Sequence, residues 1–315
     1  MSINFNNRVA IITGSGGGLG STYAMEIAKR GGAVVVNDLG GAFDGKGESH
    51  SMADAVVSRI REAGGRAIAN YDSVASRAGG EAIVKAAMDA FGRVDIVINN
   101  AGHLRNAAFD EIDDAALDSI IDVHLKGAFY VTQPAYRIMK QQGYGRVVFA
   151  SSAAGVLGNP LQAAYGAAKA GLVGLMNVLS LEGAQHGVLC NTLMPTATTR
   201  MAAAMSPAQL EEIQAQFATI APLVGNSLDP NFVTPLVVYL ASEKCKSTHA
   251  IYSATCGRYA RVFIALADGW AGPRDVAPTA DQIDVHWDQI EARDKFCVPA
   301  SLEDEFAELV KQLSR

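Results

Sequence analysis

A tyrosine and a lysine stand four residues apart in the stretch "AAYGAAKAG" at residues 163–171, which otherwise contains only alanine and glycine. Residues four apart lie on one face of a helix, with Cβ atoms about 5–6 Å apart, so Tyr165 and Lys169 should point the same way. Because a phenol has an unperturbed pKa near 10 and a neighbouring ammonium favours the phenolate, we predict that Lys169 lowers the pKa of Tyr165. Tyr165 is then a candidate general acid/base, and Ser152 is a candidate to hydrogen-bond the reacting oxygen.

A glycine-rich segment, "TGSGGGLG" at residues 13–20, joins an apolar run to a helical pattern. Such a turn from strand to helix lets backbone N–H groups approach a pyrophosphate at the positive end of the helix dipole. The segment therefore predicts a dinucleotide site, although a glycine cluster taken alone is also compatible with a plain tight turn. Its working positions are Gly14, Gly18 and Gly20, with Ser15 and Leu19 between them.

Acidic residues follow the second and third apolar runs. Asp38 stands in "VVVNDLG", where the second apolar run ends, eighteen residues after Gly20. A carboxylate there can accept hydrogen bonds from both ribose hydroxyls, whereas a 2′-phosphate would meet like charge, so Asp38 predicts NAD rather than NADP. The alternative for Asp38 is a solvated loop acid. Asp72 and Ser73 either bind the edge of the adenine or cap the helix expected near residue 74.

Short apolar runs rich in β-branched residues alternate with longer helical patterns along most of the chain. Strands that are apolar throughout are expected where helices cover both faces of a parallel sheet, because neither face meets water. The sequence therefore predicts a doubly wound, Rossmann-like α/β fold with a mostly parallel seven-stranded sheet. The expected strands are residues 9–13, 33–37, 66–70, 95–99, 146–150, 188–193 and 261–266. The expected helices lie near residues 18–31, 50–64, 74–91, 113–142, 162–186 and 229–242.

Polar residues follow two of the expected strands, as "NNAG" at 99–102 and "SS" at 151–152. Ligands of open α/β sheets bind outside the carboxyl ends of the strands, so these groups should lie near the cofactor. In this order and spacing, the glycine-rich segment, "NNAG", Ser152 and YxxxK at 165–169 resemble the short-chain dehydrogenase/reductase family over about residues 6–266. The combination is specific, although each motif alone is weak.

The resemblance implies a role for each matching residue. Tyr165 would be the catalytic acid/base, Ser152 would orient the substrate oxygen, and Lys169 would bind the nicotinamide ribose and lower the pKa of the tyrosine. Further cofactor contacts would come from Asn99, Ala101, Gly102, Pro195 and Thr198. Two positions depart from the family pattern. His124 stands where an asparagine usually supports a water-linked proton relay, and Thr196 replaces the usual glycine after Pro195. His124 either substitutes in that relay or is an ordinary hydrogen-bonded helix residue.

A finer resemblance concerns the substrate. Residues 34–74, 99–109, 123–132 and 144–159 are similar to the branch formed by the (3R)-hydroxyacyl-CoA dehydrogenase parts of peroxisomal multifunctional enzymes of type 2, also called type 4 17β-hydroxysteroid dehydrogenases. This implies oxidation of a 3-hydroxyacyl-CoA, a fatty or steroid side-chain thioester, with NAD. A free 17β-hydroxysteroid is the alternative substrate. Candidates to bind the CoA phosphates are Arg105, Lys126 and Arg200, each of which is otherwise an ordinary surface charge.

Other functional classes remain to be weighed. A non-catalytic NAD-binding module would not need Ser152, Tyr165 and Lys169 together, so these residues argue for an enzyme. An NADPH-linked ketoacyl reductase is a third alternative, and Asp38 argues against it.

The composition limits which partners and which cellular location we expect for the protein. Of 315 residues, 49% are hydrophobic and 18% charged, and the net charge is −6. Because a protein that binds a phosphate backbone needs a basic surface, we expect no nucleic-acid partner. Four cysteines without CxxC spacing indicate reduced thiols and a cytoplasmic location. No run approaches the ~18 apolar residues of a membrane span, and we expect no metal ion.

The pattern changes near the end of the chain. We expect residues 1–268 to form the NAD-binding domain with the active site, and residues 269–315 to be a C-terminal extension rather than a separate domain.

Small residues along the helix that carries Tyr165 leave room for another helix to approach. By the resemblance, the helix that carries Tyr165 packs across the interface of a homodimer or homotetramer. The alternative is close packing within one subunit. The small residues are Ala163, Ala167, Ala170, Gly171 and Gly174.

Overall fold

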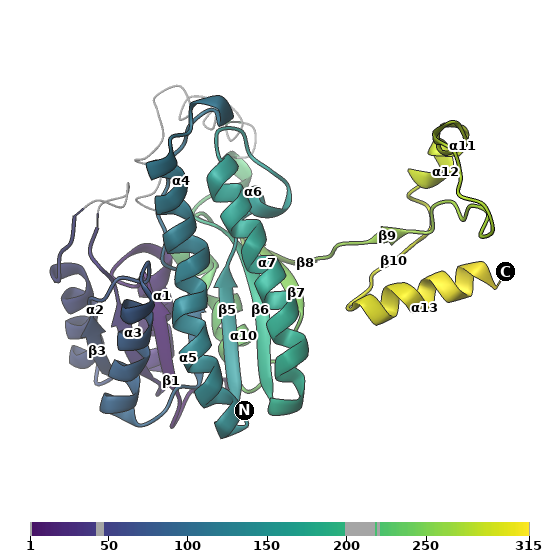
Figure 1. The fold of residues 1–315 in the computed structure, drawn as a ribbon. Helices are drawn as coiled ribbons and strands as arrows, with labels where there is room; N and C mark the ends of the chain where they lie inside the picture. The colour runs from purple at the N-terminus through teal and green to yellow at the C-terminus, as the bar shows by residue number, and fades with distance from the viewer. Residues whose placement is uncertain (1, 42–46, 199–217, 219–220, 315) are drawn as a thin grey trace. The chain divides into compact units, whose positions relative to one another are not determined.

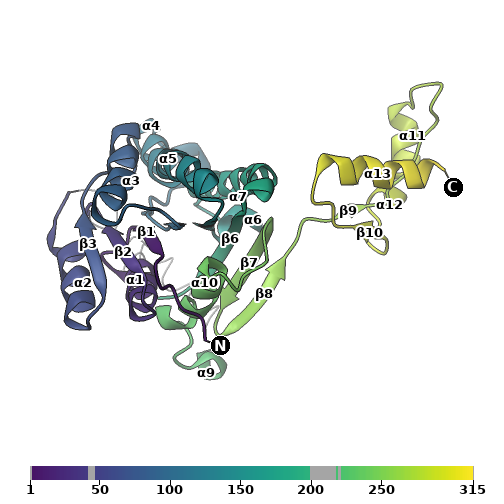
Figure 2. The same ribbon diagram turned by 90° about the horizontal axis from the view of Figure 1, so that it is seen from below.

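The chain is described by a computed structural model that covers residues 2–41, 47–198, 218 and 221–314. Its contacts divide it into two units, Met1–Arg261 and Val262–Arg315. The division comes before residue 268, at the point where the last strand of the large sheet ends. Figures 1 and 2 show the elements of each unit.

The first unit contains an eight-stranded sheet in the order β3-β2-β1-β4-β5-β6-β7-β8. Strands β1 to β7 pair in parallel, which confirms the doubly wound fold class. Every residue of β1, β2, β4 and β5 is buried, as expected for strands covered on both faces. The strands are β1 Val9–Thr13, β2 Ala33–Asn37, β3 Arg66–Asn70, β4 Ile96–Asn99, β5 Gly145–Ala150, β6 Val188–Thr196, β7 Ala250–Thr255 and β8 Arg258–Val262.

The last part of the sheet differs from the expectation. The seventh strand is β7, not residues 261–266, and β8 adds an eighth strand beside it. β7 has the mixed sequence "AIYSAT" yet is mostly buried, whereas the apolar run 261–266 is mostly exposed. Cys256 and Gly257 connect the two strands with φ values of 50° and 76°. Two residues of this conformation make a hairpin turn, so β8 runs antiparallel to β7.

Helices cover both faces of the sheet, with α1, α2 and α10 on one face and α3, α5 and α7 on the other (Figures 1 and 2). The main helices are α1 Gly18–Lys29, α2 Ser51–Glu62, α3 Arg77–Phe91, α4 Asp114–Ile121, α5 Gly127–Gln142, α7 Ala163–Gly183 and α10 Thr234–Ala241. Shorter helices are α6 Ala153–Val156, α9 Ala221–Val224 and the 3-10 turns η1 Phe109–Glu111, η3 Ala184–His186 and η5 Pro230–Phe232.

Two helices differ from their expected extent. α3 begins at Arg77, because the Ser76 hydroxyl accepts a hydrogen bond from Gly79 N at 3.1 Å and caps the helix. Ser73 instead accepts from Ala75 N, so neither it nor Asp72 is the cap. The single helix expected over 113–142 is interrupted by a π-helix, η2 Asp122–Lys126, between α4 and α5. π-helical turns are rare and occur frequently at functional sites.

The helix α7 combines a buried and an exposed face. Its buried side packs on β5 and β6. The other side is exposed and contains Ala163, Ala167, Ala170 and Gly174, followed by Val178 and Leu181. These four small residues are therefore not buried by packing within the chain. Among the described residues, the stretch Ala163–His186 is long and apolar enough to cross a membrane by length and composition alone, and 44% of its apolar 18-residue window is buried inside the protein.

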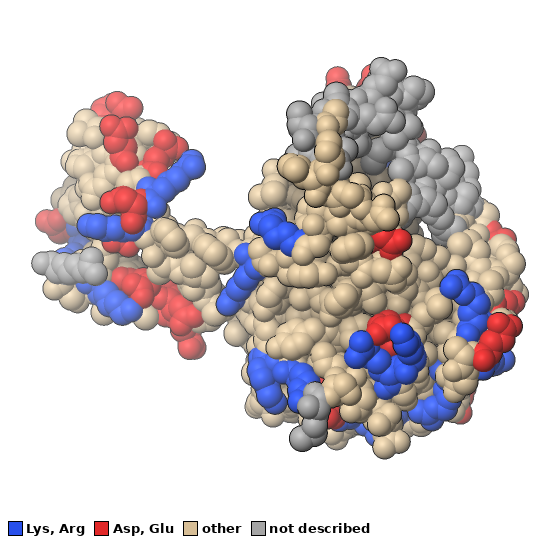
Figure 3. Space-filling model, turned by 180° about the vertical axis from the view of Figure 1, so that it is seen from behind, with Lys and Arg blue, Asp and Glu red and all other residues tan. Residues whose placement is uncertain are grey.

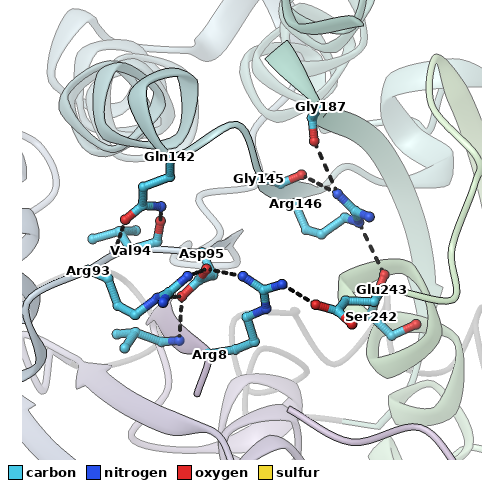
Figure 4. Close-up of polar contacts among 11 residues, drawn as sticks. Arg8, Arg93, Val94, Asp95, Gln142, Gly145, Arg146, Gly187, Ser242 and Glu243 are labelled. Atoms are coloured by element: carbon cyan, nitrogen blue, oxygen red, sulfur yellow. Dashed lines mark hydrogen bonds and ion pairs between the residues drawn. The ribbon is translucent and has the colours of Figure 1, made fainter. Parts of the chain in front are cut away.

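A network of charged side chains joins the amino ends of the central strands (Figure 4). Asp95, which is fully buried, accepts hydrogen bonds from Arg8 at 2.8 Å and from Arg93 at 2.6 and 2.7 Å. It also accepts from Val9 N at 2.9 Å, and Arg8 reaches on to Glu243 at the end of α10. Asp95 and Arg8 together therefore join three segments that are distant in sequence.

Arg146, an arginine next to this network, is bound by backbone carbonyl oxygens rather than by a carboxylate. Arg146 is 6% exposed, and its guanidinium donates to the carbonyl oxygens of Gly145, Gly187 and Ser242 at 2.8–3.3 Å (Figure 4). The Tyr144 ring lies against the guanidinium groups of Arg8 and Arg146, with centroid distances of 3.7 and 4.4 Å. These contacts compensate a buried charge by carbonyl dipoles and an aromatic face.

On the face drawn in Figure 3, lysine and arginine side chains lie among acidic ones with uncharged surface between them. Several pairs of opposite charge stand one helical turn apart, including Arg30 with Glu26 and Lys85 with Asp89. Such pairs at a helix surface support the helix by only about 0.2–0.5 kcal/mol each, whereas removing one partner of a buried ion pair is strongly destabilising.

The second unit is small and has little interior. None of its described residues falls in the fully buried class. Two short strands, β9 Leu266–Ala267 and β10 Phe296–Cys297, pair antiparallel. The helices are α11 Ala280–Val285, α12 Trp287–Ile290 and α13 Leu302–Leu313. The Trp270 and His286 rings stack with centroids 4.0 Å apart.

Candidate active site

A cleft opens at the carboxyl ends of β1 and β4, where the order of the strands reverses. Open α/β sheets bind ligands at this point, because the loops from the two strands diverge to opposite faces. The cleft is lined by the loop before α1, by the ends of β2 and β3, and by the loop after β4. The lining residues are Gly14, Gly17, Gly18, Leu19, Asn37, Asp38, Leu39, Gly41, Asp72, Ser73, Val74, Asn100, Ala101, Gly102, His103 and Val123.

Hydrogen bonds lock the glycine-rich loop to the loop after β4. The Asn100 side-chain amide donates to the carbonyl oxygens of Thr13 and Gly14 at 3.0 and 2.9 Å, and the Thr13 hydroxyl accepts from Asn100 N at 3.0 Å. Gly14 has a φ of 63°, and a Cβ there would lie 2.6 Å from Ala101 Cα. Only glycine fits this close approach. Sequence reasoning missed Thr13 and Asn100, although both stand inside the quoted motifs.

The residues of the cleft fit a dinucleotide at both ends. The N-cap of α1, Gly17, offers no side-chain acceptor, and the first turn carries no acid, so its N–H groups remain available for a phosphate. At the other end Asp38 is 6% exposed and accepts hydrogen bonds from Gly16 N at 2.7 Å and Gly40 N at 2.8 Å. Since two carboxylate oxygens have about four acceptor positions, Asp38 can still receive ribose hydroxyls.

The structure places the expected cofactor residues in two groups. Eight of them line the cleft, namely Gly14, Gly18, Leu19, Asp38, Asp72, Ser73, Ala101 and Gly102. Five further residues expected to contact the cofactor are not among the residues that line the cleft: Ser15, Gly20, Asn99, Pro195 and Thr198. Ser15 turns its hydroxyl to Ile12 O at 2.7 Å, and the Asn99 amide donates to Thr132 Oγ1 at 2.8 Å. Both side chains therefore support the loops that carry the cleft.

Ser152, Tyr165 and Lys169 come together at the carboxyl end of β5. The Lys169 ammonium donates to Ala150 O at 2.6 Å, and its nitrogen lies 5.5 Å from the centroid of the Tyr165 ring. The Ser151 hydroxyl donates to Lys169 O at 2.7 Å and fixes α7 to the strand. Ser152 begins the short helix α6 and hydrogen-bonds Tyr165. The pair expected on one face of a helix is thus in place, with the serine beside the tyrosine.

The electrostatics of this cluster differ from the expectation. Burial raises the pKa of Tyr165 above its ordinary value, and the hydrogen bond with Ser152 acts in the opposite direction. Burial also lowers the pKa of Lys169 to about 7. The pKa of Tyr165 is therefore raised rather than lowered, because the cost of burying the phenolate is the largest contribution.

A family model described as short chain dehydrogenase matches residues 8–210. The chain belongs to this short-chain dehydrogenase family. Over 255 residues, 81% of this chain, it is 46% identical to peroxisomal multifunctional enzyme type 2 of Mus musculus, of which it covers 32%. It is 41% identical over 261 residues, 83% of this chain, to the peroxisomal hydratase-dehydrogenase-epimerase of Saccharomyces cerevisiae, of which it covers 27%.

The solved structures agree with this assignment. The structure of full-length peroxisomal multifunctional enzyme type 2 from Drosophila melanogaster matches with a TM-score of 0.78 and 31% identity, over 99% of this chain and 50% of that one. This short-chain dehydrogenase therefore spans half or less of these three multifunctional relatives. Enzymes of the family generally use a nicotinamide dinucleotide, in keeping with the cleft described above.

His124 is the main departure of this short-chain dehydrogenase from its family pattern. It lies in the π-helix η2, is 2% exposed, and presents its ring edge-on to Tyr165 with centroids 5.2 Å apart. Its Nε2 lies 2.8 Å from His103 O, while Nδ1 is buried without a partner. Burial, followed by the charge of Lys169, holds the pKa of His124 well below its usual value, so the ring is neutral. A small internal cavity is lined by Asn99, His124 and Lys169 among others.

The three basic residues expected to bind a CoA phosphate lie in different parts of the chain. Lys126 forms an ion pair with Asp122 at 2.7 Å on the surface of η2. Arg105 follows β4 and its guanidinium lies 3.5 Å from Ala115 O. Arg200 lies outside the described residues. Lys126 is therefore already engaged with an acid, and Arg105 lies on the loop after β4, whose first residues line the cleft.

Proposed function

We propose that this short-chain dehydrogenase oxidises the hydroxyl group of a 3-hydroxyacyl-CoA to the 3-keto form with NAD. The observation that carries the proposal is the cluster of Ser152, Tyr165 and Lys169 beside the dinucleotide cleft. The Saccharomyces cerevisiae relative, whose name includes dehydrogenase and hydratase activities, supports a hydroxyacyl substrate. A free 17β-hydroxysteroid is the competing substrate for the same cluster.

Each side chain of the cluster has a distinct task in this proposal. Ser152 hydrogen-bonds the substrate hydroxyl and holds it toward Tyr165, which takes up the hydroxyl proton as a general base. Lys169, with a pKa lowered to about 7, is close to accepting or releasing a proton at neutral pH. The bound nicotinamide supplies the acceptor for the hydride that leaves the carbinol carbon. The chain itself orients the substrate and moves the proton.

Exposed apolar side chains near the cluster favour a lipid-like substrate. Leu157 and Leu161, between α6 and α7, are 77% and 40% exposed, and Phe109 after β4 is 84% exposed. A hydrogen bond of 3.0 Å from Ala107 N to Leu161 O joins these two loops, so the three side chains belong to one region. Exposed apolar groups that gather beside polar catalytic residues are typical of a binding site for an apolar ligand.

The substrate proposal is tested by steady-state kinetics with NAD. We expect a higher kcat/KM for (3R)-hydroxyhexanoyl-CoA than for 17β-oestradiol, measured by the formation of NADH. The (3S) thioester serves as the control for stereochemistry. A large preference for the free steroid would replace the proposed substrate, and turnover of neither compound with NAD or NADP would contradict the proposed reaction.

The cofactor proposal depends on Asp38. The Asp38→Asn substitution keeps an acceptor for one of the two backbone N–H groups but removes the negative charge that repels a 2′-phosphate. We expect the ratio of kcat/KM for NAD to that for NADP to fall by on the order of 10-fold or more, since like charges at close range in a partly buried site repel strongly. Asp89→Asn, an exposed change on α3, is the matched control. An unchanged ratio would remove the reason for preferring NAD.

A further inference from the structure

A partly buried pair of side-chain amides stands at the start of the helix that carries Tyr165. Gln162, the residue before the first turn of α7, is 9% exposed. Its Nε2 donates to Oδ1 of Asn106 at 3.2 Å, on the loop that follows β4. The start of α7 lies at the same end of the sheet as α6, which Ser152 begins (Figure 1). Two side-chain amides from distant segments therefore meet within one turn of the proposed general base.

The start of α7 places Gln162 three residues before Tyr165. The Gln162 carbonyl oxygen accepts from Gly166 N at 2.6 Å, and Gln162 is the N-cap of the helix, with non-helical φ and ψ of −121° and 35°. The side chain of an N-cap residue lies over the first turn, near the second and third helical residues, and Tyr165 is the third. The Gln162 side chain makes no capping bond there and extends to Asn106 instead.

The amide pair has donors left over. A single hydrogen bond between the two amides leaves one N–H on Gln162 and both on Asn106. Among the hydrogen bonds of the described residues, Gln162 Nε2 makes only this one. Asn106 Nδ2 makes none and is not among the buried atoms without a partner, so it is accessible. Polar donors on a mostly buried residue three positions before a reacting group are suited to a polar group of the substrate.

We propose that Gln162, held by Asn106, hydrogen-bonds the thioester carbonyl of the substrate and determines specificity for 3-hydroxyacyl thioesters. The proposal rests on the function proposed above. In such a substrate the thioester carbonyl carbon is separated from the reacting carbinol carbon by one methylene group. An amide one helical turn from Tyr165 can therefore reach the carbonyl oxygen while the phenol contacts the hydroxyl. A steroid alcohol has no oxygen in this relation, so the amide pair favours the thioester over it.

The experiment compares two substrates that differ only in this oxygen. (3R)-Hydroxyhexanoyl-CoA is measured beside its thioether analogue, in which a methylene replaces the thioester carbonyl. For wild-type enzyme we expect a clear preference for the thioester in kcat/KM. For Gln162→Met, which keeps the length of the side chain and removes the amide, kcat/KM for the thioester should fall by roughly 10- to 100-fold, the size of a lost hydrogen bond to substrate. Turnover of the thioether should change by less than about threefold, because it makes no such bond.

The controls separate this role from a purely structural one. Gln141→Met, on an exposed position of α5, should leave both substrates unchanged. If Gln162→Met does not fold, Asn106→Ala leaves Gln162 in place and should lower the preference for the thioester in the same direction. A parallel loss on thioester and thioether would mean that the pair only joins the two loops, and would overturn the inference. A wild-type enzyme that oxidises the thioester without preferring it to the thioether would also overturn it, while leaving the proposed reaction standing.

Discussion

Replacing Tyr165 by phenylalanine should lower kcat for the hydroxyacyl substrate by about 10²–10⁴-fold, the usual contribution of general acid–base catalysis. Phenylalanine keeps the ring that packs edge-on against His124 and removes only the hydroxyl. The fold and the cofactor cleft should therefore be retained. The measurement is the initial rate of NADH formation at saturating cofactor, together with the Kd for the cofactor.

The pH dependence gives an independent readout of the same group. Because burial raises the pKa of Tyr165, the phenol is protonated at neutral pH, and the form able to accept the hydroxyl proton becomes more populated as pH rises. In the wild type, kcat for oxidation should thus increase with pH, and Tyr165→Phe should lose this dependence. Tyr130→Phe, on α5 beside Arg77, is the control and should retain it. Undiminished turnover of Tyr165→Phe would require another residue to move the proton.

Replacing Asp95 by alanine should lower the free energy of unfolding by about 3–5 kcal/mol, the usual cost of removing one partner from a buried ion pair. The substitution leaves the Arg8 and Arg93 guanidinium groups without their shared carboxylate and Val9 N without its side-chain acceptor. The loss should be measured by urea denaturation, with the midpoint and slope determined separately.

The matched control for this prediction is Asp89→Ala. Asp89 also pairs with a basic side chain, Lys85, but both are exposed on α3, so this pair should contribute only about 0–1 kcal/mol. Asp95 lies at the amino end of β4, at the opposite end of the strands from the cleft. We therefore expect kcat of the folded Asp95→Ala variant to remain near that of the wild type. A cost no larger than that of Asp89→Ala would contradict the importance assigned to the network.

The family and the fold class were accessible from the sequence because their signals are local. Uniformly apolar runs predict strands that are covered on both faces, and the sheet contains such strands. The glycine-rich segment and the YxxxK pair each act through backbone geometry within a few residues, so their spacing alone predicts a turn and a shared helix face. The roles assigned to individual site residues stay predictions until the variants above are measured.

Local pattern failed where burial was decided by distant parts of the chain. The strand β7 contains serine and threonine and was missed, because its burial comes from pairing with β6 rather than from an apolar sequence. The apolar run 261–266 predicts a strand in its place, yet only its first two residues lie in β8 and most of the run is exposed. Periodicity within helices likewise gave no sign of the π-helical turn that carries His124.

The sequence by itself determined which chemical groups this enzyme carries and in what order they appear, from the glycine-rich loop to Tyr165 and Lys169. Only the tertiary structure decided how those groups behave. It buries Lys169, whose ammonium donates to Ala150 O, and this burial lowers the pKa of the lysine. It also buries Tyr165, which raises the pKa of the phenol where the sequence predicts a lower one. It also brings Asn106 to Gln162, 56 residues apart in the chain. The physical reason is that desolvation and hydrogen bonding depend on neighbours in space, and the spacing of motifs along the chain does not specify them.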